Sequence, residues 1–153
     1  MARQTWVETL SWVVADGAAV ANTVTETIVF PNITIPANYM ADGRCLRLTA
    51  YGRHGTTGTP TLTFRLRWGG VAGTVLAASG AMVTGSAVTA AIWRVELLIQ
   101  TRTNGATGTL FVIGRAAIGE DATSTVGSAT NDAAEDFMGS AGVATPAAVT
   151  VDL

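Results

Sequence analysis

Residues 61–68 read TLTFRLRW, and every second side chain in this stretch is apolar. The apolar series Leu62, Phe64, Leu66 and Trp68 alternates with Thr61, Thr63, Arg65 and Arg67. Successive side chains of a β-strand point to opposite faces, so this pattern predicts a strand with one buried and one exposed face. Two arginines on the exposed face are unexpected in a chain of net charge −2. Nucleic acid, an acidic partner protein and plain solubility are the three explanations to be weighed.

Two longer stretches show the same alternation. Residues 44–53 (RCLRLTAYGR) and 91–103 (AIWRVELLIQTRT) each place apolar side chains on one face and arginines on the other. The inward residues are Leu46, Leu48 and Ala50 in the first stretch and Trp93, Val95, Leu97 and Ile99 in the second. Asn104-Gly105 then predicts a turn into a strand at 108–118, which makes the second stretch half of a hairpin.

The remaining strands are predicted from shorter patterns. Alternation at 24–30 (VTETIVF) predicts a strand that ends at Pro31, and shorter strands are expected near 33–35, 71–80 and 147–153. Residues 119–146 are rich in Ala, Gly, Ser, Thr and acids, so a long loop is expected there, docked by Phe137 and Met138. Only residues 3–14 fit a helical period as well as an extended one.

Many strands, turn residues between them and no alternation of strands with helices predict an all-β fold, an antiparallel β-sandwich of jelly-roll type. Residues 24–153 would form this domain. Residues 1–23 would form an extended N-terminal arm, whose apolar side chains require a surface to cover them, either on the same domain or on a neighbouring molecule.

The composition favours self-association. Charged residues make up 13% and hydrophobic residues 48% of the 153 residues, whereas about 25% charge is usual for soluble domains. So few charges indicate a surface partly covered by other copies or by a larger assembly, which predicts a symmetric homo-oligomer.

The distribution of charge argues against nucleic acid as the partner. The first 114 residues carry eight arginines and five acids, and the remainder carries one arginine and six acids, which gives local net charges of +3 and −5. The whole chain therefore lacks the basic character of a nucleic-acid-binding protein. All nine basic residues are arginine, the residue best suited to pairing with carboxylates at interfaces. A solvated sheet face is the alternative reading of the exposed arginines.

No pattern for catalysis or metal binding emerges. Cys45 is the single cysteine and is expected to pack inertly in its strand, and His54 is the single histidine and is expected in an exposed loop. Asp132, Glu135 and Asp136 lack the order of a calcium loop. The chain is therefore predicted to be neither an enzyme nor a cofactor-binding protein.

Membrane insertion and export are not expected. No apolar run approaches the roughly 18 residues of a membrane span. Glu8 and Asp16 interrupt the apolar start of the chain, which argues against a signal peptide.

Three segments resemble a group of tailed-bacteriophage virion proteins that contain a β-sandwich or jelly-roll domain. They are FPNITIPANY at 30–39, GRCLR at 43–47 and TTGTPTLTFRLRWGG at 56–70. The similarity covers residues from about 28 to 118 and leaves the arm and the acidic end outside it. The resemblance implies a structural part of a virion, which in this group ranges from capsid decoration proteins to tail parts and fibres.

The predicted function is therefore that of a capsid decoration protein, made in the bacterial cytoplasm and bound to the major capsid protein between capsomers on the virion surface. The decoration-protein reading makes the expected homo-oligomer a homotrimer. A tail or fibre module that binds a host receptor or glycan is the alternative, and a free lectin-like domain is a third. The predicted interface residues are Trp6, Leu10, Trp12, Val13 and Phe137, together with Arg47, Arg65, Arg67, Arg94 and Arg115.

Overall fold

The computed structural model describes residues 7–17 and 19–119 and the backbone of two later strands, and this part of the chain is all-β without helices. The described strands are β1 Ile33–Ile35, β2 Cys45–His54, β3 Thr61–Leu62, β4 Arg65–Trp68, β5 Thr74–Ala78, β6 Met82–Val83, β7 Ala91–Thr103, β8 Thr109–Ile118, β9 Ala133–Gly142 and β10 Val149–Asp152.

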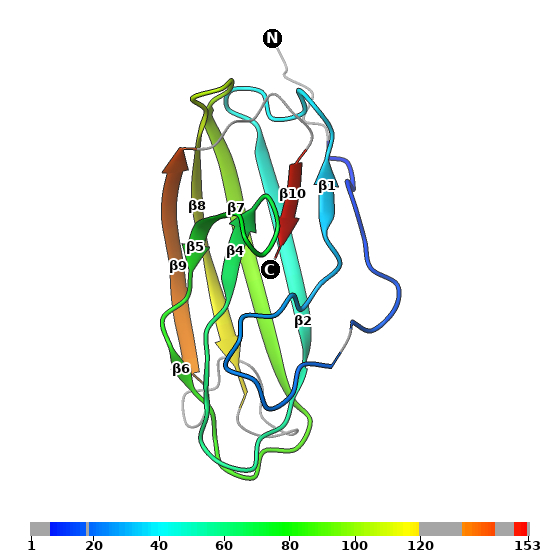
Figure 1. Ribbon diagram of the computed structural model, residues 1–153, viewed down its shortest axis with the longest axis vertical. Coiled ribbons are helices and arrows are strands. Elements are labelled where there is room, and N and C mark those ends of the chain that lie inside the picture. Colours follow the sequence, from blue (N-terminus) through cyan, green and yellow to red (C-terminus); the bar gives the residue numbers. More distant parts are fainter. Residues whose placement is uncertain (1–6, 18, 120–132, 143–148, 153) are drawn as a thin grey trace.

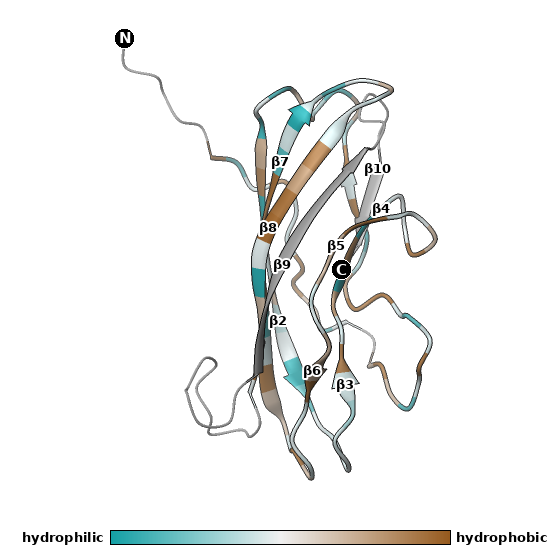
Figure 2. Ribbon diagram, turned by 90° about the vertical axis from the view of Figure 1, so that its left-hand side faces the viewer, coloured by the Kyte–Doolittle hydropathy of each residue, from teal (hydrophilic) through white to brown (hydrophobic). Residues whose placement is uncertain are grey.

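The strands form two four-stranded antiparallel sheets and a two-stranded ribbon. One sheet has the order β1-β10-β4-β5, the other has the order β2-β7-β8-β9, and β3 pairs with β6. The two larger sheets lie in separate layers, seen edge-on in Figure 2, and the buried apolar side chains pack between them. The last described strand, β10, lies between β1 and β4, so the first and last described strands are neighbours in one sheet (Figure 1).

The longest strand, β7, carries the clearest alternation. Its side chains from Ala91 to Thr101 are alternately buried and exposed, and Trp93, Val95, Leu97 and Ile99 lie in the core as predicted. β2 pairs with one edge of β7 over ten residues, and β8 pairs with the other edge. Burial of each large side chain contributes about 1.5–3 kcal/mol, so this strand supplies much of the driving force for the fold.

The turn from β7 to β8 follows the predicted Asn104-Gly105 signal. Gly105 has φ +110°, a conformation that side chains with a Cβ rarely adopt. The side-chain oxygen of Asn104 accepts a hydrogen bond of 2.8 Å from the Gly105 N–H, and the Gly108 N–H donates to the Gly105 carbonyl.

Two sequence predictions are wrong, and one alternative that the sequence left open is decided in part. Residues 24–30 contain no strand; they form an irregular segment with bends at Thr25, Val29 and Phe30, and its last two residues pack on the core. Residues 133–142 form β9, paired with β8 from Ile118↔Ala133 to Thr109↔Gly142, where a long loop was expected. The described residues 7–14 are not helical, so the helical reading of 3–14 has no support there.

Gly52 on β2 leaves room for the indole ring of Trp93. A Cβ at position 52 would lie 2.6 Å from Cζ2 of that ring, far inside normal contact. Trp93 also contacts two phenylalanines, with ring centroids 5.1 Å away for Phe64 and 5.7 Å for Phe30. The ring is therefore confined on several sides and has little space in which to move.

We predict that Gly52→Ala lowers the free energy of unfolding by about 1–3 kcal/mol, because the added methyl group displaces the Trp93 ring. Gly58→Ala is the matched control, since nothing lies within 4 Å of a Cβ there. Urea denaturation measures both variants. Equal stability of the two variants would contradict this role of Gly52.

Candidate functional site

The predicted interface arginines lie on two opposite faces of the molecule. Arg65 and Arg67 are on β4, and their neighbours Leu66 and Trp68 are buried, so the arginines point outward from the β1-β10-β4-β5 sheet. Arg47, Arg94 and Arg115 are exposed on β2, β7 and β8 and point outward from the other sheet. The core separates the two groups, so a single flat interface cannot include both.

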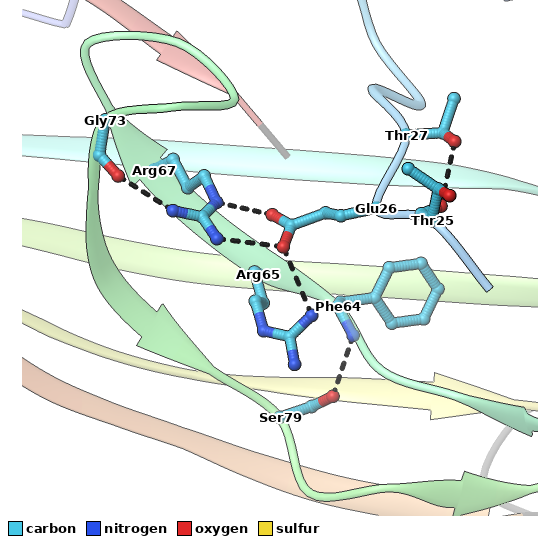
Figure 3. Close-up of polar contacts among 8 residues, drawn as sticks. All are labelled: Thr25, Glu26, Thr27, Phe64, Arg65, Arg67, Gly73 and Ser79. Atoms are coloured by element: carbon cyan, nitrogen blue, oxygen red, sulfur yellow. Dashed lines mark hydrogen bonds and ion pairs between the residues drawn. The ribbon is translucent and has the colours of Figure 1, made fainter.

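The arginines on β4 bind a carboxylate of the same chain (Figure 3). Glu26 accepts hydrogen bonds from Nε and Nη2 of Arg67, the latter at 2.8 Å, and its Oε2 lies 3.3 Å from Nη1 of Arg65. Arg67 also donates to the carbonyl of Gly73 at 2.7 Å, which ties down the turn between β4 and β5. We call Glu26, Arg65 and Arg67 the Glu26 clamp.

The Glu26 clamp holds residues 24–30 against the sheet. The hydrogen bond from Arg67, with help from the charges of Arg67 and Arg65, lowers the pKa of Glu26 despite partial burial. Four residues further on, Phe30 packs edge-on against Trp93. The segment is therefore held in place by the ion pairs of Glu26 outside the sheet and by the packing of Phe30 near the core, without a strand partner.

The second group of arginines belongs to a mixed polar and apolar surface. We call it the outer face, formed by Arg47, Tyr51, Arg94, Glu96, Leu98, Ile113 and Arg115. Register places Arg47 opposite Leu98 and Leu98 opposite Ile113, and it places Glu96 opposite Arg115. Bands of polar and apolar residues along β7 and β8 are visible in Figure 2.

Apolar side chains on the outer face are unusually accessible. Tyr51 is 76% exposed, Ile113 48% and Leu98 41%. Arg94 pairs with Glu96 two residues along the same strand. Arginines around exposed aliphatic and aromatic groups are the composition found at the centres of protein–protein interfaces.

The N-terminal segment, residues 7–17, is partly attached to its own domain. Leu10 packs against the core, and the hydroxyl of Tyr39 donates to Glu8. That hydrogen bond raises the pKa of Tyr39, whose ring also lies 4.3 Å from the guanidinium carbon of Arg44. Trp12 is 73% exposed, and Val13 and Val14 are exposed as well. Within the described residues, these apolar side chains therefore remain uncovered, and the surface that the sequence analysis expects for them stays a prediction.

Two predicted interface residues lie outside the description. Trp6 is not among the described residues, and Phe137 is described only by its backbone in β9, opposite Gly114. Among the residues that sequence reasoning missed, Glu26 is the important one. The sequence signal for Glu26 is the small number of acids: the first 114 residues contain five acids and eight arginines, so each acid is a candidate partner for an arginine.

Cys45 and His54, at the two ends of β2, also differ from expectation. Cys45 is exposed, where inert packing was expected. His54 is half-buried in a strand, where an exposed loop was expected. Both ring nitrogens of His54 are enclosed and lack a hydrogen-bond partner in the described part of the chain, and burial lowers its pKa.

The described residues contain no group of three or more His, Cys, Asp or Glu side chains that could hold a metal ion. No helix among them has the length and hydropathy needed to cross a membrane.

Comparisons with protein-family models, curated proteins and solved structures gave no match to the chain. The arguments about function therefore depend on the Glu26 clamp, the outer face and the N-terminal segment.

We predict that Arg67→Ala lowers the free energy of unfolding by about 1–2 kcal/mol, since it removes charge-assisted hydrogen bonds to Glu26 and the contact with Gly73. Its side chain is 18% exposed, compared with 41% for Arg65, so Arg65→Ala should cost less than about 0.5 kcal/mol. A double-mutant cycle with Glu26→Gln measures the coupling. Equal effects of the two arginines would refute this view of the clamp.

We predict two separate losses of stability on acidification. The pKa of His54 lies below its usual 6.5 in the folded chain, so the unfolded chain binds the proton first and stability falls as the pH drops below 6.5. The pKa of Glu26 lies below its usual 4.5, so its contribution is present above pH 4.5 and is lost as the pH falls through the folded value.

Urea denaturation at a series of pH values separates these two losses. His54→Gln should abolish the first, and Glu26→Gln should abolish the second while leaving the first in place. An unchanged pH profile in His54→Gln would show that the histidine does not sense acid.

Proposed function

We propose that this protein is a structural component of a tailed-bacteriophage virion, a decoration protein that binds the major capsid protein between capsomers and stabilises the outer shell. The observation that carries the proposal is the outer face, where Leu98 and Ile113 lie side by side in register and arginines surround them. Exposed apolar side chains grouped in this way are typical of protein–protein interaction sites. The resemblance of residues 30–70 to virion proteins points to the same class.

A jelly-roll fold fits this function. In the β1-β10-β4-β5 sheet the last described strand lies beside the first, which is the long-range return that Greek-key folds make. The hairpins β4-β5 and β7-β8-β9 are simpler, meander-like connections. The jelly-roll assignment therefore has its best support in the β1-β10-β4 part of the topology.

Self-association into a trimer is part of the proposal. A repeating shell offers many binding sites to linked copies. Once one copy of an oligomer is bound, the binding of the others is intramolecular, so the overall affinity exceeds the modest affinity of a single contact. In the Glu26 clamp, both arginines of β4 pair with a carboxylate of the same chain. The outer face and the N-terminal segment are therefore the surfaces available for the capsid and for other copies.

The alternative function, a tail or fibre module that binds a glycan, requires exposed aromatic rings in loops. The sequence offers two loop aromatics outside the N-terminal segment, Tyr39 and Phe137, and the ring of Tyr39 lies against Arg44 while its hydroxyl is bound to Glu8. The other aromatic, Phe137, belongs to β9 instead of a loop. These observations favour the capsid over the glycan.

We predict that Ile113→Asp weakens binding to undecorated capsids by about tenfold or more, because it places a charge in the centre of the apolar pair. Val83→Asp is the matched control, since Val83 is also an exposed strand residue, 55% accessible, on the small β3-β6 ribbon. Co-sedimentation with capsids and, separately, with host cells measures the bound fractions, and thermal unfolding confirms that both variants fold. Wild-type binding to cells but not to capsids would support the fibre alternative and exclude decoration.

A further inference from the structure

Within the part of the chain that the structure describes, one edge of β2 has no strand partner along its whole length. β2 is the first strand in the order β2-β7-β8-β9, and all ten of its residues pair with β7 on the other side. Among the described residues, no backbone hydrogen bond reaches Cys45–His54 from any other element. Every second residue of such an edge leaves an N–H and a C=O directed away from the sheet, ready to pair with an added strand.

Two of the devices that protect edge strands, proline and a β-bulge, are missing from this edge. Cys45–His54 contains no proline, and its register with β7 has no bulge. Its inward side chains Leu46 and Leu48 are only half-buried although they pack on the core. An added strand would cover them further.

The charge of the edge defines its partner. β2 carries Arg47 and Arg53 and no acid, and neither arginine has an ion-pair partner among the described residues. Two copies of β2 paired with each other would therefore gather four arginines without a carboxylate, which disfavours self-pairing of this strand. A strand that pairs with this edge must therefore be an extended segment that carries acidic side chains and no basic ones.

The N-terminal segment has these properties. Residues 7–16 (VETLSWVVAD) are ten residues long, as β2 is, and contain Glu8 and Asp16 with no cation and no proline. The segment is not in a strand, and no backbone hydrogen bond to it is present in the described part of the chain. Unpaired backbone of matching length and opposite charge is thus available in every copy.

We propose that residues 7–16 of one copy add to the edge of β2 of a second copy as an antiparallel strand. Full overlap places Glu8 opposite Arg53 and Asp16 opposite Cys45, diagonal to Arg47. In this register Val13 lies beside Leu48 on the inner side. Leu10, Trp12 and Val14 join the outer face, so the exchange replaces the contacts that Glu8 makes with Tyr39 and that Leu10 makes with the core in their own chain. The inference relies on the self-association in the proposed function and names the surfaces that produce it.

The chain cannot make this contact with its own β2 in the same orientation. Glu8 is held by Tyr39, which contacts Arg44 at the start of β2, so the segment begins next to the Cys45 end of its own strand. It then continues to Gly17, whose backbone lies against the carbonyl of Val29. Figure 1 shows this segment on the β1 and β2 side of the molecule. Antiparallel pairing reverses that direction and requires a second copy, and head-to-tail donation can close into a ring.

The native cysteine provides a direct test. In Asp16→Cys, the new thiol lies directly opposite Cys45 of the next copy, within reach of a disulfide. We expect a glutathione redox buffer to produce covalent oligomers of the isolated protein, with peptide mass spectrometry mapping the bond to position 16 and Cys45. The same change with Cys45→Ser should abolish this product, and Ala15→Cys, on the opposite side of the added strand, should reduce its yield severalfold.

Charge reversal tests the register independently. Arg53→Glu should reduce the yield of the cross-link about fivefold, and Glu8→Arg in the same chain should restore it. Arg102→Glu, on β7 away from the edge, is the control. A bond within one chain, a bond between two copies of position 16, or no bond at the highest soluble concentration would each overturn strand exchange. Capsid binding is measured separately: its loss with cross-linking intact would refute the decoration function and leave strand exchange standing.

Discussion

The rest of the structure depends on the two-sided pairing of β7. Its inward side chains fill the core, and its two backbone edges hold β2 and β8, so the positions of three strands follow from one alternating sequence. The same alternation places Arg94, Glu96 and Leu98 outward. Core formation and the composition of the outer face are therefore two consequences of one constraint: a change of register by one residue would exchange them.

The outward surfaces of the two sheets differ in how their charged and apolar side chains are partnered. On the β4 side both arginines are paired within the chain, because Glu26 binds Arg65 and Arg67 and holds residues 24–30 in place. The β2-β7-β8 side keeps exposed apolar groups among arginines, and it ends in an unpaired strand edge. A protein that attaches to a shell through one side while its other side faces solvent is consistent with this asymmetry.

The sequence predicts the parts of the fold in which burial alone decides the conformation. Residues 44–53 and 91–103 alternate over long stretches, and they form β2 and β7 with the expected faces. The strand predicted from the alternation at 24–30 does not form, because this segment pairs with no other strand. Its Glu26 side chain instead forms hydrogen bonds with the arginines of β4. β9 was missed because Ala, Gly and Ser give no apolar pattern, and its pairing is supplied by β8. The Glu26 clamp joins residues about 40 positions apart, a contact that no local pattern encodes.

Electron microscopy of virions labelled with an antibody against this protein tests the central claim most directly. The account predicts label distributed over the capsid shell in a repeating pattern, in keeping with many copies bound between capsomers. Label confined to the tail or fibres, or its absence from intact particles, would contradict the decoration function.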